Sequence, residues 1–397
     1  MLIKNGNIAL IHDWFLSESF GGAEKVTQIL DEYISNNFSE PDIFSLTENI
    51  TNSRNNIFKR RKINTSFIQK LPFGKSNVQK YLPFIPFAIE QFDLRKYDLI
   101  LSSSHIAAKG ILSSPDQLHI SYVHTPMRYA WDQMNTYIDH SNFKKYGLEL
   151  PLRYLLFKLR EWDYISGSRP DYLIANSKFT ARRIKKFWRL ESEIIHPPVD
   201  TKRFSFNNSR ENYYLSINRL VPNKRIDLIV KAFNKLNLPL IIIGDGPEMN
   251  FLKKIAKKNI KFFGRCSNNK VENYLSKCRG FVYAGIEDFG IAPVEAMASG
   301  APVIAYGQGG LLDTVTCLRN CPKNKISTGI LFKNQSSQDI VDTINWFEDR
   351  KVWKQFKAED LNYYAQKFNP ENFKLRIGEY IAKKWDEFHY KRTFSHQ

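Results

Sequence analysis

Two glutamates, Glu287 and Glu295, stand eight residues apart in the stretch EDFGIAPVEAMASG. On a single helix they would lie about 12 Å apart along the axis and about 80° apart around it, which is poor geometry for two carboxylates acting on one bond. The stretch instead predicts Glu287 on a loop and Glu295 in the first turns of a helix. Both could then touch one extended ligand at different points. The free N–H groups at the start of that helix would favour an anion such as a phosphate.

Apolar runs indicate the elements that hold these glutamates. Residues 281–283 predict a buried strand and residues 302–306 a second one. Between them, Pro293 marks the expected start of the helix and Gly300 its end. This order of strand, loop, helix and strand is typical of a parallel sheet covered by helices.

Cations follow an earlier predicted strand, residues 213–217. Arg219 and Lys224 lie on its exit loop, NRLVPNK. Two cations at a strand end can neutralise a diphosphate and stabilise the charge that develops when it leaves; solvated cations are the alternative. Predicted strands at 238–244 and 260–263 then end in GDGP and in Gly264-Arg265.

The N-terminal half repeats the alternation. A predicted strand at 7–11 precedes a turn at Gly21-Gly22 and a helix from Ala23, which is how a doubly wound, nucleotide-binding-like sheet opens. Further strands are expected at 97–103, 119–123 and 171–176. His124 follows the strand 119–123, at the strand end where ligands bind in such folds. His12 is a second candidate, and a packing role in the core stays open for both histidines.

These motifs, above all EDFGIAPVEAMASGAPVIAYGQGG and YVHTPMRYAWD, resemble the retaining GT-B glycosyltransferases of family 4 over nearly the whole chain. The mannosyltransferase-like branch of bacterial surface-polysaccharide synthesis is the most similar. The resemblance implies an α/β fold of two Rossmann-like, doubly wound domains that face a cleft. It implies an acceptor-binding domain at 1–200, a nucleotide-sugar-binding domain at 201–372 and a C-terminal helix, 373–397, that crosses back to the first domain.

The resemblance also implies roles for the candidate residues. Arg219 and Lys224 would clamp the donor diphosphate, and no metal or other cofactor would be needed. His124 would contact the transferred sugar near the reacting carbon, Glu287 its hydroxyls and Glu295 the ribose. No carboxylate is placed as a covalent nucleophile, so a front-face mechanism is expected, in which the leaving phosphate accepts the acceptor's proton. The remaining expected donor-site residues are Gly22, Gly264, Arg265, Phe289, Gly290 and Ile291.

The resemblance favours GDP-mannose as donor and a lipid-linked or polysaccharide acceptor. A UDP-glucose or UDP-N-acetylglucosamine donor stays open, as does a sucrose-type synthase. From a different class, a non-catalytic GT-B scaffold at the membrane is possible, although such a scaffold would be expected to lack the clamp or the glutamates.

Composition points to the remaining partners. With 397 residues the chain exceeds a single core, and its net charge of +18 favours an anionic partner. No nucleic-acid motif is present. Four cysteines fit no disulfide framework, and no apolar run has the length of a signal peptide core or a membrane span. A cytoplasmic enzyme, peripheral at the inner face of the plasma membrane, is therefore expected.

The segment 54–88 would contact an anionic membrane surface, because it carries eight cations and six interleaved aromatic residues but no acid. A solvated basic loop with its aromatic side chains in the core is the alternative. The densest cationic cluster is Lys59, Arg60, Arg61 and Lys62.

Overall fold

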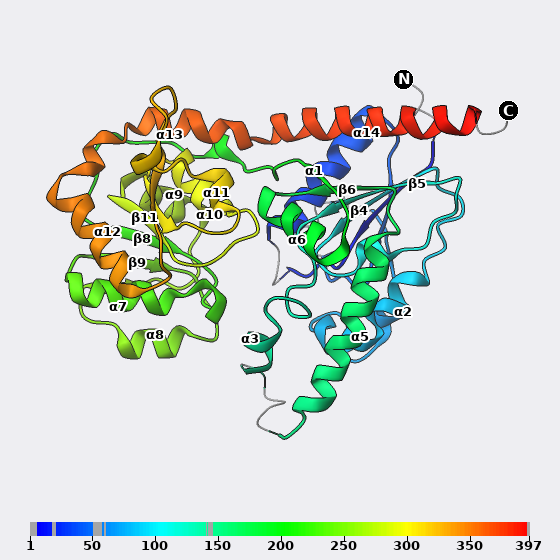
Figure 1. Cartoon of the computed structure of the whole chain (residues 1–397), viewed down its shortest axis with the longest axis horizontal. Coiled ribbons are helices and arrows are strands. Elements are labelled where there is room, and N and C mark those ends of the chain that lie inside the picture. Colours follow the sequence, from blue (N-terminus) through cyan, green and yellow to red (C-terminus); the bar gives the residue numbers. More distant parts are fainter. Residues whose placement is uncertain are drawn as a thin grey trace. The chain divides into compact units, whose positions relative to one another are not determined.

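The computed structural model describes residues 6–17, 21–50, 58, 61–139, 141 and 146–394. The chain divides into two compact units, residues 1–198 with 373–397, and residues 199–372. Each unit is built on one parallel sheet with helices on both faces (Figure 1). The expected two-domain, doubly wound α/β fold is confirmed.

The first unit contains a seven-stranded sheet in the order β3-β2-β1-β4-β5-β6-β7. Alternate residues of its strands enter two separate cores. One core contains the helices α1 (Gly22–Asn37) and α14 (Pro370–Phe394), and the other contains α2 (Ile85–Glu90) and α5 (Glu149–Gly167). The strands are β1 (Ile8–His12), β2 (Asp42–Ser45), β3 (Ile63–Thr65), β4 (Leu99–Ser104), β5 (Leu118–Val123), β6 (Tyr172–Ala175) and β7 (Glu193–Ile194).

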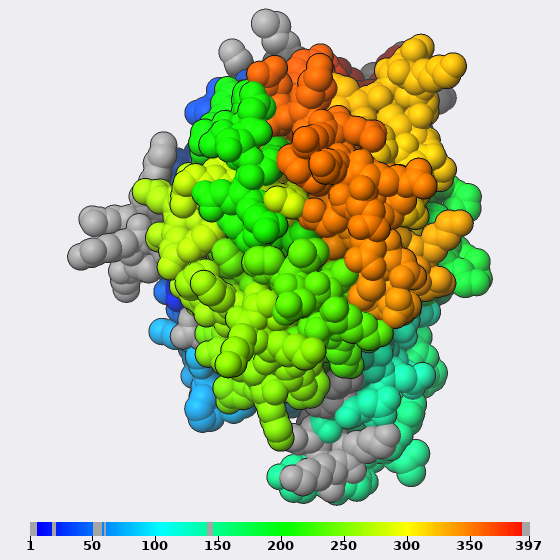
Figure 2. Space-filling model, turned by 90° about the vertical axis from the view of Figure 1, so that its left-hand side faces the viewer, coloured from blue at the N-terminus to red at the C-terminus, as the bar shows by residue number. Residues whose placement is uncertain are grey.

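The second unit contains a six-stranded sheet in the order β10-β9-β8-β11-β12-β13. The helices α7 (Ile226–Leu236), α8 (Met249–Ile255) and α12 (Ser337–Asp349) pack on one face and are seen in Figure 2. The helices α10 (Ile291–Ala298) and α13 (Ala358–Ala365) pack on the other face, which α9 (Asn268–Lys277) also adjoins. The strands are β8 (Tyr214–Ile217), β9 (Leu240–Ile243), β10 (Ile260–Phe262), β11 (Gly280–Tyr283), β12 (Val303–Tyr306) and β13 (Gly329–Phe332).

The C-terminal helix α14 packs on the first unit, as expected. Phe373, Ile377, Ile381 and Trp385 recur at helical spacing and are buried against β-strand residues and α1. In the described part of the chain, no helix combines the length and apolarity needed to cross a membrane.

Helix α10 begins two residues earlier than predicted. It starts at Ile291, after Gly290 has closed the turn with a φ of 96°, a conformation that side-chain-bearing residues rarely adopt. Pro293 is therefore the third helical residue. It is tolerated there because the N–H groups of the first turn have no partner within the helix.

Candidate functional site

The expected donor-site residues of the second unit gather where its sheet changes direction. The chain runs outward from β8 through β9 to β10, then returns to place β11 on the other side of β8. In open parallel sheets, ligands bind beyond the carboxyl ends of the strands at such a switch point. Arg219 and Lys224 follow β8, and Glu287 follows β11, so the two loops that diverge at the switch carry the expected clamp and the first glutamate.

Close backbone packing holds these loops together. The α-carbon of Gly309, after β12, lies against Glu287, and an added Cβ there would come 2.5 Å from the Glu287 carbonyl oxygen. On the other side, an added Cβ at Gly244, after β9, would come 1.8 Å from the carbonyl oxygen of Asn218. Both glycines also have positive φ, so a larger residue would be excluded by conformation and by space. Gly244 of GDGP and Gly309 of GQGG therefore allow the neighbouring loops to approach closely, and this close contact holds the loops in place.

Lys224 and Glu287 are in direct contact. The Lys224 ammonium forms an ion pair with Glu287 Oε1, and the Tyr283 hydroxyl donates a hydrogen bond of 2.5 Å to the same oxygen. Both charged side chains are largely buried, with exposed fractions of 21% and 16%. The sequence places these residues on separate loops and could not show this contact, which fixes the cation and the carboxylate within reach of one ligand.

Glu295 lies on the fifth residue of α10 and also has a cationic partner. Arg203, on the short helix Thr201–Arg203, approaches Glu295 at 3.3 Å and Glu272 of α9 at 3.4 Å. The α10 N-terminus, which can bind an anion, thus lies between the loop of Glu287 and the Arg203–Glu295 pair. Arg203 was not singled out from the sequence, since nothing in its local pattern distinguishes it from other surface arginines.

The other expected donor-site residues of this unit have different environments. The Phe289 side chain is buried and contacts Phe368 at a ring distance of 5.4 Å, so a donor could meet only its backbone. Gly290 caps α10 and Ile291 is its first residue. Arg219 and Arg265 are exposed at the strand ends, and Gly264 adopts a φ of 59° beside Arg265.

In the first unit the switch point lies between β1 and β4. The carboxylate of Asp13, after β1, is fully buried and accepts hydrogen bonds from four successive backbone N–H groups, those of residues 105–108. It also contacts His105 Nδ1 at 2.9 Å. Burial raises the pKa of Asp13, but His105 and these hydrogen bonds outweigh it and hold the pKa well below its usual range. Burial lowers the pKa of His105, but the Asp13 carboxylate outweighs burial and raises that pKa above its ordinary value.

His124 occupies the next strand end, as expected, and is joined to this cluster. Its Nε2 lies 2.8 Å from the Ser103 hydroxyl, and its ring lies 6.5 Å from that of His12. Burial lowers the pKa of His124 well below its ordinary value and that of His12 to about 4, with neighbouring histidines adding to the shift. Both rings are therefore neutral at pH 7. His12 Nδ1 is within 3.2 Å of Ser103 and Thr27, which favours the packing role for His12.

The Asp13–His105 pair was not predicted from the sequence. The pattern HDW shows Asp13 beside a strand end, but its partner lies 92 residues later, and only the strand order brings the two together. A search of residues directly after β1 and β4 would have found both. Gly22 is the first residue of α1; residues 18–20 of its loop lie outside the described ranges.

A buried ion pair supports the loops around His124. Lys109 Nζ lies 2.7 Å from Asp163 on α5, and both side chains are almost fully buried. The indole N–H groups of Trp131 and Trp188 donate to the other oxygen of Asp163, each at 2.8 Å. Every polar atom of this carboxylate therefore has a partner, as a buried charge requires.

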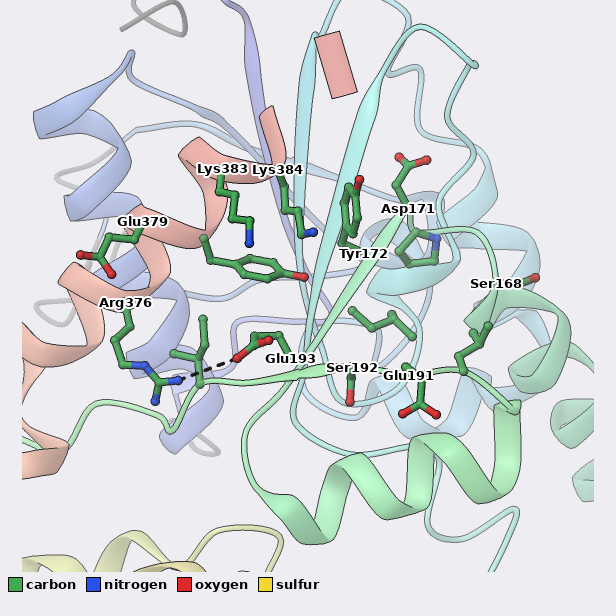
Figure 3. Close-up of a pocket in the computed structure, with 15 residues that line it drawn as sticks. Ser168, Asp171, Tyr172, Glu191, Ser192, Glu193, Arg376, Glu379, Lys383 and Lys384 are labelled. Atoms are coloured by element: carbon green, nitrogen blue, oxygen red, sulfur yellow. Dashed lines mark ion pairs between the residues drawn. The ribbon is translucent and has the colours of Figure 1, made fainter. Parts of the chain in front are cut away.

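A separate cavity of about 620 Å³ lies in the first unit between α14 and the β6–β7 edge (Figure 3). Its charged lining residues nearly balance: the cations are Arg376, Lys383 and Lys384, and the acids are Asp171, Glu191, Glu193 and Glu379. Such a lining does not select a dianionic diphosphate, and none of the expected site residues belongs to it.

No group of three histidine, cysteine, aspartate or glutamate side chains within the described ranges is arranged to hold a metal ion.

We predict that the stability of the fold decreases in mild acid partly because of His119. Burial in β5 lowers its pKa to about 3, so below about pH 6.5 the unfolded chain binds a proton that the folded chain does not. At pH 5 this should cost about 2 kcal/mol relative to pH 7. His119→Gln, which can keep the hydrogen bond to Ser102, should flatten the fall in melting temperature between pH 7 and pH 5. Parallel curves for variant and parent would contradict the assignment.

Two family models match this chain. The model described as Glycosyltransferase Family 4 matches residues 20–203, and the model described as Glycosyl transferases group 1 matches residues 199–368. Together they cover most of both units.

Curated relatives include mannosyltransferases. The alpha-1,3/1,6-mannosyltransferase ALG2 of Candida glabrata is 26% identical over 217 residues, 41% of this chain and 47% of that protein. A GDP-mannose-dependent monoacylated alpha-(1-6)-phosphatidylinositol monomannoside mannosyltransferase of Corynebacterium glutamicum is 30% identical over 196 residues, 39% of this chain and 51% of that protein. The matches thus span about half the length of these relatives.

Solved structures show the same fold. Sucrose-phosphate synthase of Thermosynechococcus elongatus aligns with a TM-score of 0.71 at 17% identity, covering 96% of this chain and all of that chain. HepE of Anabaena, in complex with UDP, aligns with a TM-score of 0.65 at 16% identity, covering 95% of this chain and all of that one. At this level of identity the likeness establishes the architecture alone.

Proposed function

Because this chain belongs to the GT-B glycosyltransferases of family 4, we propose that it transfers a mannosyl group from GDP-mannose, with retention of configuration, to a lipid-linked saccharide or a polysaccharide. The observation that carries the proposal is the contact of Lys224 with Glu287 at the switch point of the second sheet. Mannose as the sugar is supported by relatives such as ALG2 and the corynebacterial enzyme.

The cations, the carboxylates and the neutral histidine of the site have different roles in this proposal. Arg219, Lys224 and the N-terminus of α10 neutralise the diphosphate and stabilise it as it leaves. Glu287 accepts hydrogen bonds from the sugar hydroxyls, and Glu295 does so from the ribose. His124, neutral and fixed by Ser103, donates or accepts a hydrogen bond near the reacting carbon. The leaving phosphate oxygen takes the acceptor's proton, so the protein needs no separate base.

The second candidate is a UDP-sugar-dependent transferase. It is favoured by HepE, whose solved structure contains UDP. The two candidates share the diphosphate clamp and differ in the base, which Gly264 and the exposed Arg265 would adjoin.

We predict that GDP-mannose raises the melting temperature of the protein, since a ligand that binds only the folded state stabilises it. Lys224→Ala should abolish most of the shift. Lys231→Ala should not, because Lys231 lies on α7 and is half exposed beside Asp227. A shift with UDP-sugars alone would move the proposal to the second candidate, and no shift with any nucleotide-sugar would contradict it.

Glu287→Gln should separate the sugar contact from the diphosphate contact. Losing a charged acceptor for sugar hydroxyls should weaken GDP-mannose binding about tenfold or more. GDP binding should stay equal or become tighter, because a negative charge beside the diphosphate is removed. Calorimetric titration of both ligands measures this difference. Equal weakening of GDP and GDP-mannose would argue against a sugar contact.

Transfer should continue in EDTA, because fixed cations take the place that a metal would have at the diphosphate. The measurement is mannose transfer, or slow hydrolysis of GDP-mannose, before and after chelation. Activity lost in EDTA and regained with magnesium or manganese would contradict the clamp.

The proposal places the enzyme at the inner face of the plasma membrane as a peripheral protein, where a lipid-linked acceptor would be found. The charge of the chain supports this placement.

A further inference from the structure

Four phenylalanine side chains are exposed within a short segment of the first unit. The exposed fractions of Phe67, Phe73, Phe84 and Phe87 are 38%, 63%, 55% and 58%. Phe67 and Phe84 lie on the short helices Phe67–Lys70 and Val78–Phe84, and Phe87 lies on α2. Phe73 lies on the loop between the two short helices, and the rings of Phe67 and Phe87 lie 5.8 Å apart. Single exposed apolar side chains are common, but a group of large aromatic ones marks a surface that another phase or molecule covers.

Lysine side chains lie close to the Phe73 ring. Lys70, Lys75 and Lys80 are exposed, and Lys80 Nζ lies 4.1 Å from the centre of the Phe73 ring. From Phe67 to Ile89 the sequence contains no acid. Lys70 and Lys75 also line a hollow of about 460 Å³ together with Phe73 and Ser76. The surface therefore combines apolar rings with positive charge that no acidic residue of the segment offsets.

The loop that carries Phe73 is held in place. Phe73 has a φ of 61°, which is unfavourable for a residue with a side chain. Three hydrogen bonds fix its neighbours: Thr47 Oγ1 donates to the Gly74 carbonyl at 3.0 Å, Asn49 Nδ2 to that of Lys75 at 3.1 Å and Tyr81 OH to that of Pro72 at 2.5 Å. Such a strained conformation persists when its surroundings determine it. The ring is thus held outward instead of folding onto the core.

We propose that this aromatic-basic face, defined as Phe67, Lys70, Phe73, Lys75, Lys80, Phe84 and Phe87, docks on a bilayer of anionic phospholipid. The phenylalanine rings enter the boundary between headgroups and acyl chains, and the lysines lie against lipid phosphates. The proposal rests on the proposed function only in that a lipid-linked acceptor requires the enzyme at a membrane. Vesicle binding without donor or acceptor tests it separately.

The structure changes which residues of segment 54–88 carry this role. Arg61 pairs with Asp31 and with Glu40 and is largely buried, and Phe58 is fully buried. The expectation that Arg61 is a membrane-facing cation is therefore wrong, because its charge is used within the fold. Arg54, Lys59 and Arg60 lie outside the described residues.

The test uses the full chain with vesicles of phosphatidylcholine, alone or mixed with phosphatidylglycerol. Each well-placed lysine contributes about fivefold to binding an anionic surface, so replacing Lys70, Lys75 and Lys80 with Gln should weaken binding to the mixed vesicles on the order of 100-fold. Phe73→Asn should weaken it about tenfold, as one inserted ring is lost. Asparagine is chosen because it tolerates positive φ.

The second unit offers matched controls on α8 and just beyond it. Phe251 is 48% exposed, and Lys253, Lys254 and Lys258 are also exposed. Phe251→Asn and the triple Lys→Gln variant there should bind mixed vesicles like the parent. All variants should keep the parent's melting temperature, which shows that they are folded.

Several results would overturn the proposal. One is equal loss of binding in the control lysine variant, which would indicate attraction by net charge alone. Another is unchanged binding of Phe73→Asn, which would show that no ring enters the bilayer. A third is a dimer in solution that Phe73→Asn dissociates, which would assign the face to a second copy of the chain. Failure of GDP-mannose to bind, with vesicle binding intact, would count only against the proposed function.

Discussion

The loops of each unit meet at one edge because all strands of its sheet are parallel. Where the strand order reverses, between β8 and β11 or between β1 and β4, two neighbouring loops diverge and leave room for a ligand. The candidate residues follow from this constraint. The loops that begin at the switch point of the second unit carry Arg219, Lys224 and Glu287. The loops that begin at the switch point of the first unit carry Asp13 and His105.

The two units fix their loops by different means. The second unit relies on backbone contact, in which Gly244 and Gly309 let neighbouring loops touch. The first unit relies on buried charge. Asp13 binds four backbone N–H groups, and Asp163 binds Lys109 and two indoles. Buried charges tolerate little displacement once their partners are set, so this arrangement suits a site that must hold neutral histidines in one geometry.

The sequence predicted the fold well because apolar runs and glycine turns are local signals. Strands such as β5 and β11 are observed within a residue of their expected bounds. The predicted start of α10 was wrong by two residues, because the helix begins directly after the turn at Gly290 and not at Pro293. The short edge strand β3 was not predicted. It lies within the basic segment 54–88, and three residues are too few to show an alternating pattern. The candidate site residues were named from local motifs and stay predictions, whereas the pairings between distant residues were not predicted. The Lys224–Glu287 and Asp13–His105 contacts and the Arg61–Asp31 pair join residues separated by 30 to 92 positions, and no local pattern encodes them.

In the proposed function, the switch point of the second sheet binds the diphosphate of a nucleotide-sugar. A crystal structure of the protein with GDP bound tests it most directly. We expect the β-phosphate to lie within hydrogen-bonding distance of Lys224 or Arg219 and of the first N–H groups of α10. A nucleotide bound elsewhere, with the Lys224–Glu287 pair untouched and Arg219 facing solvent, would contradict it.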